Sequence, residues 1–386
     1  DLLCIPRSAS VRMLSWAHQG LWRPRPNGRG LDPKFMNIAE MLKQKDYKTG
    51  IFGKWHVGDQ PDTRPAARGF DESAGLMYSN DMWEFHPENP DYWGKFPLQY
   101  YENNKVTIPR VTKEHQPHLT TWSTKKAVEF IGRHKEEPFF VYVPHSMPHV
   151  PLFVSEKFAG KSGAGLLGDV LMEIDWSVGQ INQALKDNGL ENDTLLVFTS
   201  DNGPWVSYGN HAGATPFREA KGTSFDGGIR SACLAKYPGK LAAGSASEAA
   251  WCTIDLLPTI AHLTETPLPK NTIDGKNVWP LITGAKDAKT PQPYYAFSNG
   301  RDFQGVISGD GKWKLHVPHT YRTLVKPAND GQAGKYRQST IALSLFDLEN
   351  DPYETTNVAA KHPKVFESLQ QVANKHRAEF YPPKKN

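Results

Sequence analysis

The chain has 386 residues, of which 38% are hydrophobic and 22% are charged. At roughly 150 residues per domain this length suggests two or three domains, and it excludes a peptide-scale or disulfide-stapled fold. The 45 Lys and Arg residues and the 41 Asp and Glu residues give a net charge of +4, which is too small to imply a nucleic-acid partner. The longest apolar runs are far shorter than the ~18 residues that a membrane span needs, so no membrane span is expected.

Helices and short strands alternate along the first half of the chain. A capping-box pattern beginning at Asn37 predicts a helix from Asn37 to about Asp46, and Tyr47 to Phe52 follows as a strand. Trp122 to His134 has helical apolar spacing, and Phe139 to Val143 has the composition of a buried strand. Each helix therefore precedes a strand.

A third unit repeats this order with the clearest pattern. One stripe of its helix comprises Val170, Ile174, Val178, Ile181 and Leu185. Gly189 can end this helix, and Thr194 to Thr199 is then a strand. The alternation predicts an α/β fold with a mostly parallel sheet flanked by helices, which binds ligands at the carboxyl ends of its strands.

After about residue 285 the pattern changes to short strands separated by turns. The predicted strands are Tyr294 to Ser298, Gly305 to Ser308, Trp313 to Val317 and Leu343 to Leu348. Asp310 and Gly311 form a hairpin signal between two of them, and Pro363 to Phe380 reads as a final helix. We therefore expect a large α/β domain over residues 1–285 and a small C-terminal subdomain over residues 286–386, with an antiparallel sheet and one helix.

Polar side chains gather directly after the three strands of the first half. Lys54 and His56 follow one strand, His149 follows the second, and Asp201 and Asn202 follow the third. Lys and His can supply a fixed cation and a titratable group to one pocket, and carboxylate and amide oxygens are ligands of Ca²⁺ or Mg²⁺. Taken singly, the segment of Lys54 and His56 could equally be a surface loop, and an Asp-Asn-Gly sequence is more often just a turn.

A further loop, residues 218–230, adds a second lysine. Lys221 stands in it beside a glycine, and Gly227 and Gly228 allow close approach of the backbone. A solvated charged loop would have the same composition. The joint occurrence of two lysines, histidines and an Asp-Asn pair at one edge of a sheet predicts a metal-assisted pocket for a tetrahedral oxyanion.

Five segments carry a resemblance to a known family. They are GIFGKWHVG from Gly50, SDNGPWVSYGNHAG from Ser200, REAKGTSFDGGIR from Arg218, IDLLPTIAHL from Ile254 and LFDLENDPYETTN from Leu345. In order and spacing the chain resembles the formylglycine-dependent sulfatases of the arylsulfatase A type, from about residue 31 to its end. The resemblance implies an alkaline-phosphatase-like α/β fold with a small C-terminal sheet domain, and hydrolysis of aryl or carbohydrate sulfate esters.

The resemblance also implies roles for individual residues. Lys54 and Lys221 would bind sulfate, with Lys221 and His149 at the bridging ester oxygen. Ser79 would donate a hydrogen bond to sulfate, and His56 would orient and deprotonate the nucleophile.

The implied cofactors are Ca²⁺ and a modified cysteine. Asp201 and Asn202 would be calcium ligands. A maturation enzyme would oxidise Cys4 to formylglycine, whose hydrate attacks sulfur. The family implies a secreted, periplasmic or lysosomal location and a sulfated small molecule or glycan as substrate.

The sequence departs from the family pattern near its start. The family motif is Cys-x-Pro-Ser/Ala-Arg, whereas Cys4 is followed by Ile5, Pro6, Arg7 and Ser8, which places the arginine one position early. The family's first strand, which ends in paired Asp ligands of the metal, has no counterpart before Cys4. We therefore expect an N-terminally incomplete chain that hydrolyses sulfate esters poorly.

Two other functions remain open from the sequence. A phosphatase or phosphodiesterase of the same superfamily would also bind a tetrahedral anion, although such enzymes typically carry more Asp and His metal ligands. A sulfatase-like protein that binds sulfated glycans without hydrolysing them would account for the displaced arginine and the missing carboxylates.

Overall fold

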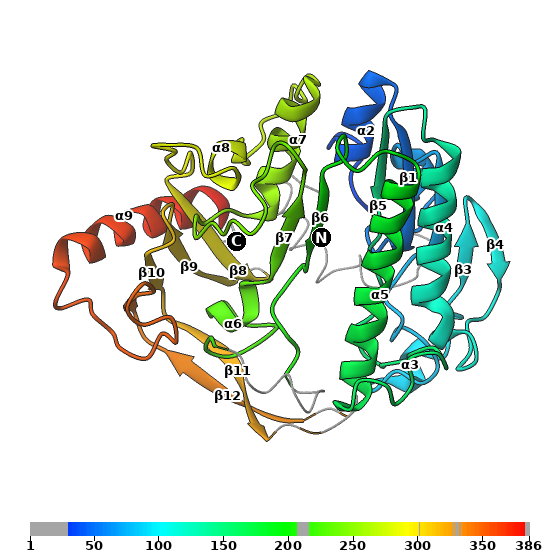
Figure 1. Ribbon diagram of the computed structural model, residues 1–386. Helices are drawn as coiled ribbons and strands as arrows, with labels where there is room; N and C mark the ends of the chain where they lie inside the picture. The colour runs from blue at the N-terminus through cyan, green and yellow to red at the C-terminus, as the bar shows by residue number, and fades with distance from the viewer. Residues whose placement is uncertain are drawn as a thin grey trace.

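The computed structural model shows a mixed central sheet flanked by helices and a smaller antiparallel sheet covered by one long helix (Figure 1). None of its helices in the described part of the chain is long and apolar enough to cross a membrane. The predicted nucleophile position Cys4 lies outside the described residues. The structure describes residues 30–206, 216–300, 302–326, 328, 332 and 334–382.

The central sheet has five strands in the order β4-β3-β2-β1-β5. Strands β2 (Glu72–Leu76), β1 (Lys48–Lys54) and β5 (Phe139–Tyr142) run parallel, as the α/β pattern predicts. Strands β3 (Tyr100–Glu102) and β4 (Lys105–Ile108) add an antiparallel edge that the sequence did not indicate. The carboxyl ends of β1, β2 and β5 therefore lie at one edge of the sheet.

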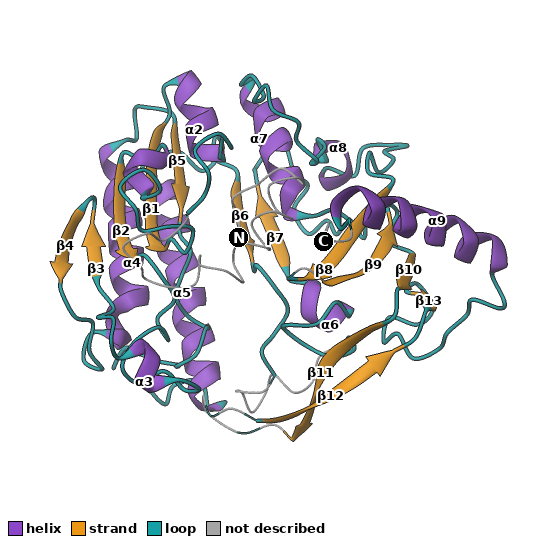
Figure 2. Ribbon diagram, turned by 180° about the vertical axis from the view of Figure 1, so that it is seen from behind, coloured by secondary structure: helices purple, strands orange, loops and turns teal. Residues whose placement is uncertain are grey.

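The strand predicted at Thr194 to Thr199 does not join the five-stranded sheet. Strand β6 (Leu196–Thr199) forms a separate antiparallel pair with β7 (Cys233–Lys236). Both views place this pair between the five-stranded sheet and the C-terminal strands (Figures 1 and 2). The loop of Asp201 leaves β6, and the loop of Lys221 leads into β7.

Helices cover the two faces of the central sheet. Phe52 of β1 packs edge-on against Phe130 of α4 (Leu119–Arg133), with ring centroids 5.7 Å apart, and α4 packs beside α5 (Gly165–Asp187). Phe140 of β5 points to the other face, where α2 and α7 meet. The remaining helices are α2 (Ile38–Leu42), α3 (Pro90–Trp93), α6 (Asp226–Ile229), α7 (Leu256–Thr264) and α8 (Trp279–Ile282), with 3-10 turns at Lys43–Lys45, Pro65–Arg68, Gln116–His118 and Thr253–Asp255.

The local signals at helix ends behave as predicted. The side chain of Asn37 accepts a hydrogen bond from the backbone N–H of Glu40, whose carboxylate accepts one from the N–H of Asn37. Gly189 has a φ of +72° just after α5, a conformation that glycine adopts without a steric penalty.

The C-terminal sheet has four antiparallel strands in the order β13-β10-β9-β8. The turn at Asp310 and Gly311 joins β9 to β10 as predicted. Helix α9 (Pro363–Phe380) packs against this sheet through Leu369 and Ala373. The strands are β8 (Tyr294–Asn299), β9 (Asp302–Ser308), β10 (Trp313–His316) and β13 (Ser344–Asp347).

A two-stranded ribbon, β11 (His319–Lys326) with β12 (Lys335–Ile341), was not predicted. Its strands are mostly polar, so they lack the apolar alternation that marks a half-buried strand. On one face of the ribbon, Tyr321 packs against Phe225 and accepts a hydrogen bond from Arg218. The ribbon therefore lies against the loop that carries Lys221.

A buried ionic cluster joins the C-terminal sheet to this same loop. The Nζ of Lys314 lies 2.8 Å from the carboxylate of Asp226 and 3.1 Å from that of Glu354. His316 lies 2.9 Å from Glu354. Burial tends to raise the pKa of Glu354, but Lys314 and His316 hold it below its usual value, so its carboxylate stays ionised. The cluster depends on Lys314 for charge balance.

We expect Lys314→Met to destabilise the protein by about 3–5 kcal/mol, because it leaves the buried Asp226 and Glu354 without their shared cation. Urea unfolding measures this loss. Lys312→Met is the matched control, since Lys312 forms an exposed pair with Glu349 and its loss should cost less than about 1 kcal/mol. Equal losses in the two variants would contradict this account of the cluster.

Candidate active site

Lys54 and His56 lie at the end of β1, where the backbone passes close to the residues that follow β2 and β5. The backbone N–H of Lys54 donates to the carbonyl of Pro144 at 2.8 Å, and that of His56 donates to Met77 at 2.9 Å. A Cβ on Gly53 would lie 2.1 Å from the Pro144 oxygen, so only glycine allows this approach. These contacts bring the ends of β1, β2 and β5 together.

His56 itself is in the left-handed region, with a φ of +62°. Non-glycine residues adopt this conformation at an energetic cost, and such residues concentrate at functional sites. The imidazole meets the ring of Tyr78 edge-on, with centroids 6.0 Å apart.

His149, in the loop after β5, is held by two neighbours. Its Nδ1 lies 2.7 Å from the carbonyl oxygen of Val150 and 3.3 Å from the Oγ of Ser79, which follows β2. In the neutral imidazole, donation from Nδ1 to Val150 leaves Nε2 as the basic nitrogen. The ring also meets the indole of Trp205 edge-on, with centroids 5.0 Å apart.

Lys221 reaches the same indole from a different loop. Its Nζ lies 4.4 Å from the centre of a Trp205 ring, and its backbone N–H donates to Pro204 at 3.0 Å. Trp205 thus touches both His149 and Lys221, which are far apart in the sequence.

Glycines set the distance between the loop of Asp201 and the loop of Lys221. The N–H of Gly203 donates to Gly228 at 2.9 Å, and a Cβ on Gly203 would lie only 1.9 Å from the oxygen of Gly227. The predicted close approach at Gly227 and Gly228 is therefore present. It fixes Asp201 relative to Lys221.

The electrostatics of the site link the same residues. Burial is the main cause that holds the pKa of His56 well below its usual value, and the charges of Lys54 and Lys221 lower it further while Asp201 opposes them. Burial also lowers the pKa of Lys221 to about 8, with Lys54 adding to the shift and Asp201 opposing it. Lys54, His56, Asp201 and Lys221 lie close enough to feel one another's charge.

His149 belongs to the same electrostatic group. Burial lowers its pKa to about 4, the carboxylate of Asp81 opposes this shift, and Lys221 and Lys54 add to it. At neutral pH, without a bound anion, His149 is neutral and Lys221 is mostly protonated.

The grouped side chains remain accessible to solvent. Lys54, His56, His149 and Lys221 are half-buried, and Asp201 is exposed. Burial tends to raise the pKa of Asp201, but the charges of Lys54 and Lys221 contribute to lowering it. Of the predicted site residues, only Cys4 cannot be placed among the others.

Asp201 and Asn202 are hard oxygen donors of the type that Ca²⁺ prefers. However, no group of three or more His, Cys, Asp or Glu side chains that could hold a metal occurs in the described residues. The two residues fit a calcium site in kind and supply part of the ~6 to 8 ligands.

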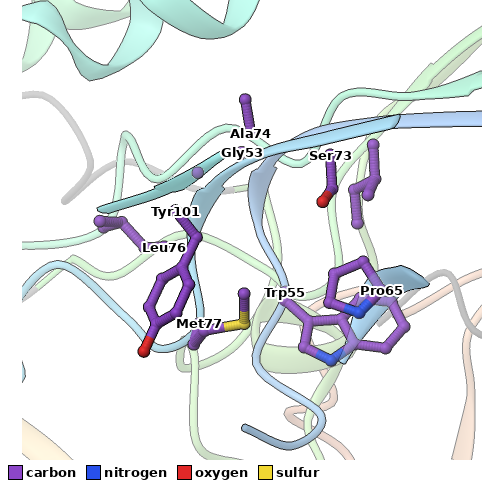
Figure 3. A pocket seen from close by; sticks show the side chains of 10 residues that line it. Gly53, Trp55, Pro65, Ser73, Ala74, Leu76, Met77 and Tyr101 are labelled. Carbon is purple, nitrogen blue, oxygen red and sulfur yellow. The ribbon is translucent and has the colours of Figure 1, made fainter. Parts of the chain in front are cut away.

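The cavity in Figure 3 is distinct from this site. Gly53, Trp55, Leu76 and Tyr101 are among its lining residues, and none of the predicted site residues is. Because neighbouring residues of a strand point to opposite faces, it lies on the face of β1 opposite the Lys54 side chain. Its largely apolar lining carries no fixed charge.

Three residues of the site were missed by sequence reasoning. Trp205 lies inside a quoted family segment, but an aromatic residue after Pro204 gives no catalytic signal by itself. Asp81 is buried, has no partner for Oδ1, and acts electrostatically on His149 and Lys221. Arg322 acts on Lys221 from the ribbon, and its sequence context carried no motif.

Comparisons with known proteins identify the family of the chain. Residues 7–266 match the family model described as Sulfatase. Arylsulfatase A of Homo sapiens is 32% identical over 406 residues, covering 96% of this chain and 77% of that protein. The N-acetylgalactosamine-6-O-sulfatase of Bacteroides thetaiotaomicron is 29% identical over 407 residues, covering 89% of this chain and 77% of that protein.

A solved structure, the PsFucS1 sulfatase from Pseudoalteromonas sp., matches the fold with a TM-score of 0.79. The match has 20% sequence identity and covers 100% of this chain and 82% of that chain. The predicted alkaline-phosphatase-like fold class is confirmed.

Proposed function

The chain belongs to the sulfatase family of sulfuric ester hydrolases, and we propose that it cleaves sulfate monoesters of aryl or carbohydrate alcohols at the site described above. The observation that carries the proposal is the convergence of Lys54, Lys221, His56 and His149 on one accessible site. A sulfate ester spreads negative charge over its oxygens, and two lysines match that charge.

The departing alcohol needs a proton, and two groups can supply it. Lys221 is protonated below a pH of about 8. The negative charge of a bound sulfate favours the protonated form of His149, which Val150 and Ser79 hold in place. We place both groups at the bridging ester oxygen, with Lys54 on the sulfate oxygens and Ser79 as a donor.

We further propose that the activity belongs to the minor fraction of chains in which Cys4 is converted to formylglycine, and that Asp201 and Asn202 bind Ca²⁺. When present, the aldehyde hydrate supplies the oxygen nucleophile and the cation neutralises sulfate charge. His56, whose low pKa keeps it neutral, accepts a proton in this arrangement.

Calcium binding predicts a stability difference. At 100 times its dissociation constant a ligand stabilises a protein by about 2.7 kcal/mol, and Asp201→Ala is expected to remove most of this gain. Thermal melts with and without Ca²⁺ measure it. Asp193→Ala, which removes an exposed carboxylate just before β6, should keep the full gain. An unchanged calcium response in Asp201→Ala would show that Asp201 is not a ligand.

The lowered pKa of Lys221 predicts a pH dependence. If Lys221 acts in its protonated form, kcat/KM is retained below a pH of about 8 and falls as pH rises through that value. In Lys221→Arg the fall should move beyond pH 10, because arginine keeps its charge. The measurement is a pH profile with an aryl sulfate. If kcat/KM of the arginine variant falls at the same pH as that of the wild type, the fall belongs to the titration of another group.

The direct test is turnover by protein co-expressed with a formylglycine-generating enzyme. Release of sulfate from nitrocatechol sulfate, with slower release of phosphate from nitrophenyl phosphate, is expected. The reverse preference would favour the phosphatase or phosphodiesterase alternative. Binding of sulfated oligosaccharides with no release from either substrate would favour the non-catalytic alternative.

A further inference from the structure

The ribbon β11–β12 places an arginine beside the proposed sulfate site. Arg322 lies on β11, and its Nη2 is 3.7 Å from the position that a Cβ on Gly222 would take. Gly222 follows Lys221 directly. The charge of Arg322 also contributes to lowering the pKa of Lys221, which agrees with this proximity.

Arg322 is held in place but carries no counter-charge. Its guanidinium lies 4.4 Å from the centre of the Tyr336 ring, which comes from the neighbouring strand. In the described part of the chain, no carboxylate pairs with Arg322 and no acceptor bonds to it. A guanidinium has five N–H donors in a planar fork that matches a carboxylate or a sulfate. Its donors are therefore open to a ligand.

The ribbon that carries Arg322 is basic, although Thr323, which points to its other face, donates a hydrogen bond to the carboxylate of Glu219. The two strands of the ribbon contain four cationic side chains and no Asp or Glu: Arg322, Lys326, Lys335 and Arg337. Such a surface attracts anions and repels cations. The nearby lysine of the proposed sulfate site, Lys221, adds to the positive field.

We infer that Arg322 forms a second anion subsite, and that the substrate is a sulfated glycan with a further acidic group near the sulfate that is cleaved. This inference rests on the proposed function and narrows its substrate class. The acidic group is a sulfate or a carboxylate, since both present two oxygens to the guanidinium fork. Tyr336 keeps the guanidinium oriented, which reduces the entropy lost on binding.

Kinetics on matched substrates test this subsite. The probes are a monosulfated disaccharide, the same disaccharide with a second sulfate, and the same disaccharide with a uronate in place of that sulfate. Wild type should prefer one of the two diacidic probes, and Arg322→Ala should raise KM for that probe by about 10- to 100-fold. This is the usual effect of losing a hydrogen bond to a charged group. KM for the monosulfated probe should change less than about threefold.

Arg337→Ala is the control for charge. It removes an arginine from the same ribbon, but Arg337 pairs across the strands with Thr323 and so lies on the face opposite Arg322. It should leave the preference for diacidic probes within about twofold, because exposed charges contribute little. Arg322→Lys should recover only part of the preference, since lysine lacks the planar fork.

Two outcomes would overturn the subsite: an equal rise of KM on all probes, or no rise on any. If wild type cleaves no sulfate ester, the proposed function fails, but calorimetric titration with the diacidic probes still tests Arg322. The subsite would be supported, independently of turnover, if wild type binds a diacidic disaccharide more tightly than the monosulfated one and Arg322→Ala binds both equally. Equal affinities for all probes in wild type would refute it.

Discussion

Replacing Lys221 by alanine is expected to lower kcat/KM for an aryl sulfate about 100- to 1000-fold, the usual effect of losing one preorganised charge-stabilising group. The half-buried Nζ lies over Trp205, within electrostatic range of Lys54 and His149, so its loss removes one of the positive charges that the proposed mechanism places on the sulfate ester. Steady-state kinetics with nitrocatechol sulfate measures the loss.

Lys240→Ala is the control for this loss, because Lys240 is an exposed lysine in the turn after β7. Its activity should stay within about twofold of wild type, as for most surface substitutions. A loss in Lys221→Ala of less than tenfold would remove Lys221 from the chemistry. Retention of normal thermal stability in Lys221→Ala would show that the loss is not one of folding.

Exchanging two residues shortly after Cys4 is expected to change turnover by a comparable factor in the opposite direction. Arg7→Ser combined with Ser8→Arg restores the Cys-x-Pro-Ser-Arg order of the family motif. Turnover should rise by about 100-fold or more, because an unconverted thiol lacks the hydrate oxygen that the proposed mechanism needs. Co-expression with the maturation enzyme and sulfate release from nitrocatechol sulfate measure the gain.

Mass spectrometry of the peptide that contains Cys4 separates conversion from catalysis. The exchanged variant should contain mostly aldehyde and the natural sequence mostly thiol. Cys4→Ala in either background should be inactive. Equal and rapid turnover by both cysteine-containing proteins would show that the position of Arg7 is harmless and that our interpretation of the motif is wrong.

Periodicity was sufficient to predict the elements that pack an apolar face. Helices α4, α5 and α9 and strands β1, β5 and β10 all lie where apolar spacing placed them. Strand β2 was missed because Ser73, Ala74 and Gly75 carry almost no apolar signal. A Cβ on Gly75 would lie 1.8 Å from the oxygen of Gly53, so close strand contact, not hydrophobicity, selects this sequence.

The residues of the candidate site also fall into two groups, those that the sequence could predict and those that it could not. Residues directly after predicted strands, such as Lys54 and Asp201, could be predicted because a parallel sheet brings its strand ends together. Asp81 and Arg322 could not, since their place depends on a loop and on a polar ribbon whose packing no local pattern encodes. Their importance follows from distance and charge, which only the folded chain supplies.

The buried cluster of Lys314, Asp226 and Glu354 limits how this protein can be engineered. It ties residues 218–230, the loop of Lys221, to a sheet nearly a hundred positions further along the chain. A chimera that takes its C-terminal part from a relative must therefore import a matching lysine and glutamate together with the ribbon. Otherwise the exchange would remove the support of the Lys221 loop, and altered specificity would be indistinguishable from lost activity.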